Sequence, residues 1–219
     1  MLLCSLSLPI VTTRMESLFS AMIALLLVSF SCFTASALTS NNGNIVVKWD
    51  LMSWTPDGYV AVVTAYNNQK QRSIPSPGWE MSWRWTKKEV IWSMVGARTT
   101  YQGDCSMFKG NIPHSCVRKP TVVDLPPGTP YNQQVANCCK GGVLKPGLES
   151  AFQLSVGLAG TTNKTARMPK SFTFTAPKQQ YICGPAKNVR ATKFITADGR
   201  RVTSAVATWN ITCVFHKAT

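Results

Sequence analysis

Apolar and polar residues alternate with the two-residue period of a β-strand in many short stretches of this sequence. In the first stretch, the odd positions from Ile45 to Leu51 are all apolar. Further stretches of this kind cover residues 59–64, 79–85, 90–95, 121–125, 151–158, 171–175, 188–196 and 201–214. After residue 37 the sequence shows no long helical period with capping residues. The pattern predicts an all-β fold, specifically an antiparallel β-sandwich.

Turn-forming residues separate the predicted strands. Thr55-Pro-Asp-Gly58 and Asp198-Gly199 both have the composition of tight turns. Between residues 96 and 147, prolines, glycines and four cysteines replace the alternating pattern. Because proline removes a backbone donor from a sheet, we expect a disulfide-rich loop region there.

Tryptophan is concentrated near the start of the predicted domain, since six of the seven tryptophans lie between residues 44 and 94. On a strand, Trp79, Met81, Trp83 and Trp85 share one face, because alternate side chains point the same way. Such an aromatic face either packs into a core or contacts a flat partner.

Flat indole rings stack well on the apolar faces of sugars, and a row of them on a rigid sheet binds with little ordering cost. Four tryptophans are therefore candidate carbohydrate-binding residues: Trp54, Trp79, Trp83 and Trp85. Trp49 and Trp92 lie in periodic, β-branched strands, which favours a place in the core. Burial of the four candidates is the alternative, because patterning does not distinguish an exposed face from a covered one.

The first 37 residues have the layout of a secretory signal peptide. A dense apolar run of about 16 residues, Leu18 to Phe33, follows Arg14 and precedes Ala35-Ser-Ala37. A membrane anchor is the alternative, but a spanning helix needs roughly 20 residues. Met15 is a second candidate start, which makes residues 1–14 an upstream extension. We expect residues 38–219 to form a single secreted domain without a transmembrane helix.

The chain is strongly basic, with 23 Lys and Arg against 9 Asp and Glu and a formal net charge of +14. The first 37 residues hold one Arg and one Glu, so their removal leaves this balance unchanged. Such a charge attracts anionic partners. The predicted secretion and the lack of nucleic-acid-binding motifs exclude nucleic acid as the partner. They favour an acidic polysaccharide or an anionic membrane surface instead. Cations scattered over a solvated surface are the alternative.

Cysteines agree with export, because an even number in an exported chain predicts disulfides. Six follow residue 37: Cys105, Cys116, Cys138, Cys139, Cys183 and Cys213. Adjacent cysteines point apart in most backbone conformations, so we expect Cys138 and Cys139 to have different partners. Two Asn-x-Thr sequons, at Asn163 and Asn210, predict N-glycosylation.

The residues give little support for catalysis or for a cofactor. No Cys-x-x-Cys pair is present, and the only histidines are His114 and His216, so we expect no metal. Glycoside hydrolysis needs two carboxylates at a set separation, whereas the acids of this chain are dispersed and several lie in turns. We therefore predict that the protein is not an enzyme.

Long runs of the sequence resemble the COBRA-like proteins of plants and together cover nearly all of the mature chain. These runs are Gly43–Tyr59, Lys88–Gly96, Gln102–Ser106, Phe108–His114, Tyr131–Gln134, Asn137–Gly142, Gly157–Thr165, Cys183–Ala186 and Thr208–Cys213. The resemblance implies an extracellular protein of the plasma membrane and cell wall that acts in cellulose deposition and oriented cell expansion. It also implies that this part of the family is similar to a cellulose-binding module.

In the family, a second cysteine-rich region follows, and then a tail that is exchanged for a glycosylphosphatidylinositol anchor. This sequence ends at Thr219, before either, so we expect a truncated and secreted form. It also has His114-Ser-Cys116 where the family commonly has two adjacent cysteines, so the disulfide scheme of the family does not transfer intact.

These observations lead to one main hypothesis, a non-catalytic protein that binds cellulose or a related β-glucan and acts in microfibril deposition. Two alternatives stay open. One is an electrostatic binder of acidic wall polysaccharide or of a membrane surface, and the other is a protein-binding scaffold in wall assembly.

Overall fold

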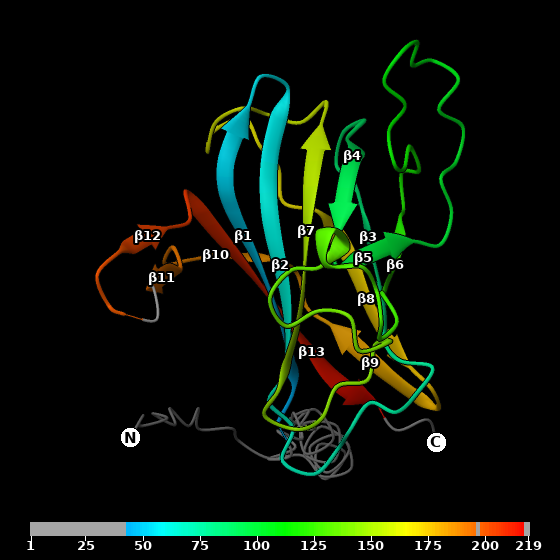
Figure 1. Ribbon diagram of the computed structural model, residues 1–219, viewed down its shortest axis with the longest axis vertical. Coiled ribbons are helices and arrows are strands. Elements are labelled where there is room, and N and C mark those ends of the chain that lie inside the picture. The colour runs from blue at the N-terminus through cyan, green and yellow to red at the C-terminus, as the bar shows by residue number, and fades with distance from the viewer. Residues whose placement is uncertain (1–42, 196–197, 217–219) are drawn as a thin grey trace, which may run out of the picture. The chain divides into compact units, whose positions relative to one another are not determined.

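Strands form nearly all of the regular structure in the computed structural model, which describes residues 43–195 and 198–216. The all-β prediction is confirmed (Figure 1). The predicted signal peptide, residues 1–37, lies outside the described residues. Within the described part, no helix has the length and apolar character that crossing a bilayer requires.

The strands follow the predicted alternation closely in the first half of the domain. Their bounds are β1 Ile45–Thr55, β2 Gly58–Asn67, β3 Glu80–Arg84, β4 Val90–Val95, β5 Ala97–Thr99, β6 Thr121–Asp124, β7 Glu149–Gly157, β8 Lys170–Ala176, β9 Gln179–Cys183, β10 Lys187–Val189, β11 Lys193–Ile195, β12 Val202–Ser204 and β13 Ala207–His216. One 3-10 turn, Tyr131–Gln133, lies in the long connection between β6 and β7.

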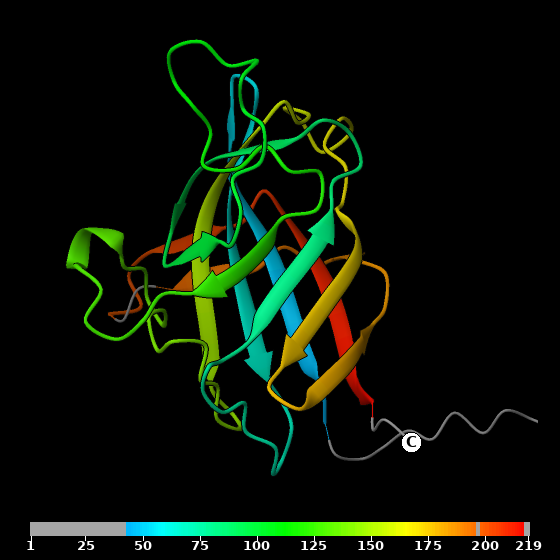
Figure 2. The same cartoon turned by 90° about the vertical axis from the view of Figure 1, so that its right-hand side faces the viewer.

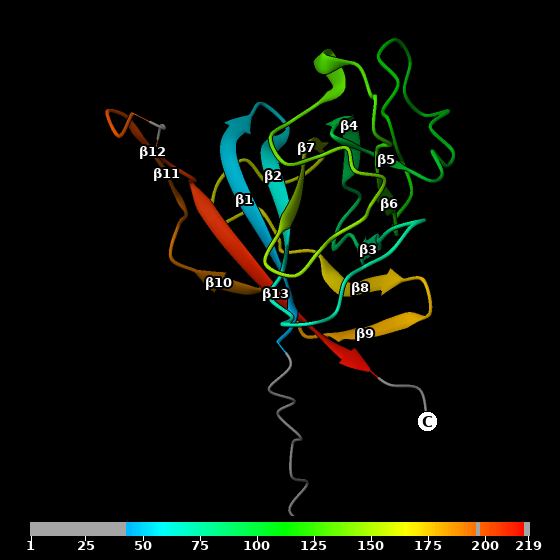
Figure 3. The same ribbon diagram turned by 60° about the horizontal axis from the view of Figure 1, so that its bottom comes forward.

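One antiparallel sheet folds back on itself to make two layers. Its strand order is β4-β7-β2-β1-β13-β9-β8-β3-β6-β5, and β10 also pairs with β13. Most of β13 pairs with β1, whereas its last residues, 213–216, pair with β9. Figures 2 and 3 show β13 passing from the layer of β1, β2 and β7 to the layer of β3, β8 and β9. The predicted sandwich is therefore closed along one side by a shared strand.

The core between the layers is aromatic because the inward faces of β1 and β3 both carry tryptophan. The rings of Trp49 and Trp83 meet edge to face with centroids 5.0 Å apart, and Trp83 and Trp85 meet at 5.4 Å. Trp79 stacks on Phe152 of β7 at 6.1 Å. Burial of these large apolar surfaces is the main driving force for closing the two layers.

The tight turn predicted after β1 is present, whereas the turn predicted at Asp198-Gly199 lies in a longer hairpin connection, because Ile195 pairs with Val202. Pro56 and Asp57 connect β1 to β2, and Asp198 and Gly199 lie between the paired strands β11 and β12. A bulge between Leu51 and Ser53 interrupts the register of β1 with β2 near this first turn.

All six predicted cysteines form disulfides, but one pairing was predicted wrongly. The bonds join Cys105 to Cys116, Cys183 to Cys213, and the adjacent Cys138 to Cys139. The backbone has a positive φ of 68° at both Asn137 and Cys139, and this sharp turn brings the two neighbouring sulfurs together. Cys138 and Cys139 therefore do not have separate partners.

Candidate functional site

Three of the four tryptophans predicted to bind carbohydrate lie inside the sandwich. The side chains of Trp79, Trp83 and Trp85 are at most 2% exposed. They share one face of β3 and its flanks, as the alternation predicted, but the layer of β1, β2 and β7 covers that face. The prediction that these rings form a surface platform is wrong, because a sugar cannot reach them.

The remaining tryptophans of this region differ in burial, since Trp49 lies in the core and Trp54 and Trp92 lie at its margin. Trp49 is fully buried, as predicted. Trp54 is half-buried and lies opposite Tyr59 in the β1–β2 ladder, with the two rings edge to face at 6.3 Å. Trp92, which we expected in the core, is also only half-buried. Carbohydrate binding by Trp54 stays a prediction.

Trp92 links the tip of the β1–β2 hairpin to the long loop between β5 and β6. Its indole Nε1 donates a hydrogen bond of 2.8 Å to Oδ2 of Asp57. Its ring meets Phe108 of the loop edge to face, with centroids 5.2 Å apart. In Figure 1 this loop projects past the ends of the strands. The Trp92 and Phe108 rings thus form a half-exposed aromatic pair at the base of the loop.

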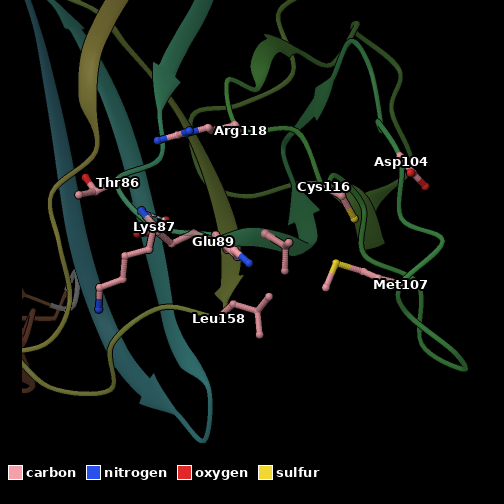
Figure 4. A pocket seen from close by; sticks show the side chains of 10 residues that line it. Thr86, Lys87, Glu89, Asp104, Met107, Cys116, Arg118 and Leu158 are labelled. Carbon is pink, nitrogen blue, oxygen red and sulfur yellow. Dashed lines mark hydrogen bonds between the residues drawn. The ribbon is translucent and has the colours of Figure 1, made fainter.

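A cavity of about 540 Å³, which we call the loop pocket, is lined in part by Met107, the residue that precedes Phe108 (Figure 4). Met107 and Asp104 of the loop line one side, and Thr86 and Lys87 line the other. The remaining lining residues are Lys88, Glu89, Val90, Cys116, Arg118 and Leu158. Met107 and Leu158 are 71% and 41% exposed, which is high for large apolar side chains.

Hydrogen bonds to neighbouring segments fix the turn that forms one wall of the pocket. Thr86 donates its hydroxyl to the carbonyl of Met168 at 2.9 Å, and Lys87 Nζ donates to the carbonyl of Thr165 at 3.0 Å. The Glu89 carboxylate is buried and accepts the backbone N–H of Lys87. These bonds hold the turn between β3 and β4 in one conformation.

Covalent and backbone contacts fix the opposite wall. The Cys105–Cys116 disulfide closes the loop that carries Met107 and Phe108. Where the loop returns, Ser115 forms a β-bridge with Ile91 of β4, with N–H to carbonyl distances of 2.9 and 3.1 Å. A loop held at its base in this way can present side chains to a ligand with little loss of entropy.

The loop pocket combines groups that suit a neutral or acidic sugar. Its apolar surface fits the hydrophobic face of a pyranose ring, and its Lys and Arg side chains can donate hydrogen bonds to hydroxyl oxygens. Hydrogen bonds donated by the side chain and the backbone of Ser106 lower the pKa of Asp104. Asp104 is therefore a charged acceptor at ordinary pH.

The other predicted site residues are placed as follows. Asn163 is exposed, whereas Asn210 is half-buried in β13 between β1 and β10. Glycosylation at both stays a prediction. In the part of the chain that the structure describes, no three His, Cys, Asp or Glu side chains cluster to hold a metal ion.

Sequence reasoning missed the residues that make the loop pocket. Met107 and Phe108 belong to no periodic stretch and Leu158 is the last residue of the predicted stretch 151–158, so their proximity depends on the fold. The spacing of Cys105 and Cys116 was the one usable signal, because a disulfide across eleven positions closes a compact loop.

Comparison with known proteins gives a consistent set of matches. The sequence pattern of the COBRA N-terminal domain matches residues 59–216. The chain is 79% identical over 206 residues to COBRA-like protein 5 of Arabidopsis thaliana, which covers 94% of this chain and 100% of that protein. It is 61% identical to Protein COBRA of the same plant, with 90% of this chain and 45% of that protein covered.

A third relative, COBRA-like protein 3 of Oryza sativa subsp. japonica, is 63% identical over 80% of this chain and 39% of its own length. The chain thus spans the whole of one relative and less than half of the other two. No solved structure matches it.

Proposed function

Because this chain belongs to the COBRA family, we propose that it is a non-catalytic extracellular protein of the plant cell wall. It binds cellulose or a related β-glucan and acts in the deposition of cellulose microfibrils and in oriented cell expansion. It is secreted to the wall and the outer face of the plasma membrane, which the sequence of residues 1–37 supports.

The observation that carries this proposal is the half-exposed pair of Trp92 and Phe108, the second of which directly follows Met107 of the loop pocket in sequence. An aromatic pair next to hydrogen-bond donors and acceptors is the usual composition of a carbohydrate site. Trp54, half-buried near the tip of the β1–β2 hairpin, is a second candidate contact.

The form of this site favours single glucan chains over the flat face of a crystal. A crystalline surface is best matched by several coplanar rings in a row, and the three rings that would form such a row are buried. The Trp92 and Phe108 rings stand at 77° to each other, so only one of them can lie flat on a given sugar. The proposed ligand is therefore an individual glucan chain, before or outside its crystalline packing.

A non-catalytic role is supported by the state of the two carboxylates in the loop pocket. A glycosidase needs one carboxyl group with a raised pKa to protonate the leaving oxygen. The pKa of Asp104 is instead lowered by its hydrogen bonds from Ser106. The Glu89 carboxylate accepts a backbone N–H, which ties it to the turn rather than to a substrate.

Titration of the purified chain with cellohexaose, followed by calorimetry and by depletion on amorphous cellulose, tests the proposal. Phe108→Ala should weaken binding on the order of tenfold, as expected for loss of one stacking ring. Tyr131→Ala removes a 91% exposed ring from the 3-10 turn and serves as the matched control, with unchanged binding. Absence of binding by the parent chain, or equal binding by both variants, would contradict the proposed site.

A further inference from the structure

Three exposed cations lie opposite one another on β3, on β8 and on the segment that leads into β6. Arg84 of β3 pairs in register with Lys170 of β8. On the other side of β3, Ser82 pairs with Thr121 of β6. The antiparallel pairing continues beyond β6, because the backbone N–H of Trp85 donates to the carbonyl of Arg118 at 2.9 Å. The same register places Lys119 opposite Arg84. We call Lys119, Arg84 and Lys170 the cationic row.

The cationic row is a line of like charges across the sheet. Adjacent strands are about 4.8 Å apart, so three positions in register span roughly 10 Å. All three side chains are exposed. Like charges directly opposite each other destabilise a sheet, and only a bound anion or solvent ions relieve the repulsion.

The acids of the described chain do not neutralise the row. No acid within the described residues forms an ion pair with Arg84, Lys119 or Lys170, and the pair of Arg200 with Asp198 lies between β11 and β12. Glu80 is an exposed acid on β3, but it lies four residues from Arg84, about 13 Å along a strand. That separation exceeds the Debye length of about 8 Å at physiological ionic strength.

Two further exposed cations, Arg118 and Arg167, are close in sequence to members of the row. Arg118 precedes Lys119 and lines the loop pocket. Arg167 is exposed and precedes Met168, whose carbonyl accepts the hydroxyl of Thr86. The three cations of the row are exposed and lie across the sheet, not in an enclosed cavity, which suits an extended anion better than a small enclosed one.

We propose that the cationic row binds a carboxylated polysaccharide of the polyuronate class. Repeated carboxylates on one chain can contact successive cations, and exposed Thr173, three residues from Lys170 on the same strand, offers a hydroxyl for the sugar hydroxyls. An anionic membrane is the less suitable partner. Among the described residues, no exposed large apolar side chain lies on β3, β6 or β8, and membrane-surface binding normally adds such side chains to the cations.

This inference does not depend on the proposed glucan site, because none of the three residues of the row lines the loop pocket. The two sites can thus be tested separately on the same chain. Failure of cellohexaose binding leaves the polyuronate experiment unaffected.

The test is binding of the full chain to immobilised sodium polygalacturonate at about 50 mM salt. The variant carries R84Q, K119Q and K170Q, and a matched control carries K70Q, K145Q and K193Q, three exposed cations elsewhere with the same loss of charge. We expect the affinity of the row variant for the polymer to fall by about tenfold or more, and that of the control to stay within about threefold of the parent chain. Each exposed ion pair contributes little, and the contributions add up only when the cations contact the same ligand. Raising the salt to about 200 mM should weaken binding of the parent chain more than that of the row variant.

Two further probes separate the sources of anion. Fully methyl-esterified polygalacturonate, which lacks the charge, should not bind. The row variant and the matched control should bind vesicles that contain phosphatidylserine equally well. Equal weakening by the row variant and the control overturns the proposal, and so does row-dependent binding to the vesicles without binding to the polymer.

Discussion

At the scale of single residues, burial divides the tryptophans into those that hold the fold and those that remain available. Trp83 contacts Trp49, Trp85 and Phe172, with ring centroids between 5.0 and 6.3 Å apart. Most of these contacts are edge to face, the arrangement that aromatic rings prefer. Trp83 is therefore the centre of the aromatic core.

Replacing Trp83 should destabilise the protein in a way that depends on shape more than on hydrogen bonding. Trp83→Ala should lower the free energy of unfolding by about 3–5 kcal/mol, because a large cavity remains. Among the described residues, no acceptor is within hydrogen-bond reach of the Trp83 indole N–H. Trp83→Phe should therefore cost only about 1–2 kcal/mol, since it also removes an unpaired buried donor. Urea unfolding measures both, and a larger loss for Phe than for Ala would contradict this account.

His114 predicts a dependence of stability on pH. The backbone N–H of Thr99 donates to Nε2 of this half-buried ring at 3.3 Å, and burial lowers the pKa of His114 from its usual value. The unfolded chain thus binds the proton more readily than the folded one. The contribution to stability is complete above the unfolded pKa of about 6.5 and is lost as pH falls through the lower folded pKa.

The measurement for His114 is urea unfolding of the parent chain and of His114→Gln between pH 8 and pH 5, a range that brackets a usual histidine pKa of about 6.5. The parent should lose stability relative to the variant as the pH falls. A parallel decline of the two proteins would show that His114 does not contribute, and an NMR titration of its ring gives the folded pKa directly.

At the scale of elements, Asp124 connects the end of β6 to the turn that contains the adjacent disulfide. Its buried carboxylate accepts the backbone N–H groups of Cys139, Lys140 and Gly142 at 2.8–2.9 Å. Three bonds to one carboxylate satisfy donors that the turn itself leaves free. Asp124 therefore fixes the conformation of residues 139–142, which belong to no helix or strand.

Asp124→Asn should destabilise the protein by about 2–4 kcal/mol, because the NH₂ group of the asparagine would point at a backbone N–H that needs an acceptor. Asp104→Asn is the matched control, since Asp104 is exposed and accepts the N–H of Ser106 in a similar local turn. That control should change stability by less than about 0.5 kcal/mol. Hydrogen exchange at residues 139–142 should rise in the Asp124 variant, and unchanged exchange there would refute the role of this carboxylate.

The sequence predicted those elements whose side chains alternate cleanly between core and solvent. Residues 90–95 were predicted with the observed bounds of β4, and the start of β1 at Ile45 was also correct. β9 was missed because Tyr181 is its only buried residue, so no alternation is visible. The stretch 201–214 is in fact two strands, because the chain turns at Ala205 and Val206, where Val206 N–H bonds to the carbonyl of Leu51.

The candidate site was less predictable than the strands because its parts come from distant segments. Alternation correctly gave Trp79, Trp83 and Trp85 a common face. It could not show that a second layer covers that face, which depends on long-range pairing of β13 with both β1 and β9. The pairing of Trp92 with Phe108 depends in the same way on where the loop folds back.

At the scale of the whole molecule, the two layers act as one unit because β13 belongs to both. β13 lies beside β1 along residues 207–213 and beside β9 along residues 213–216. Cys213 stands at the point of transfer and pairs in register with Cys183 of β9, to which it is also bonded by a disulfide. Separation of the layers would thus break a covalent link as well as the aromatic core.

This position predicts that the Cys183–Cys213 bond contributes more stabilisation than either of the other two disulfides. It spans 30 residues of sequence, and the chain-entropy model gives about 3–4 kcal/mol for a loop of that length. The Cys138–Cys139 bond joins neighbours and restricts the unfolded chain very little. Replacing Cys183 and Cys213 with alanine should therefore lower the free energy of unfolding by about 3–4 kcal/mol, against less than about 1 kcal/mol for the Cys138 and Cys139 pair. Urea unfolding of the two double variants under oxidising conditions decides the point, and equal losses would mean that loop closure is not what stabilises the joined layers.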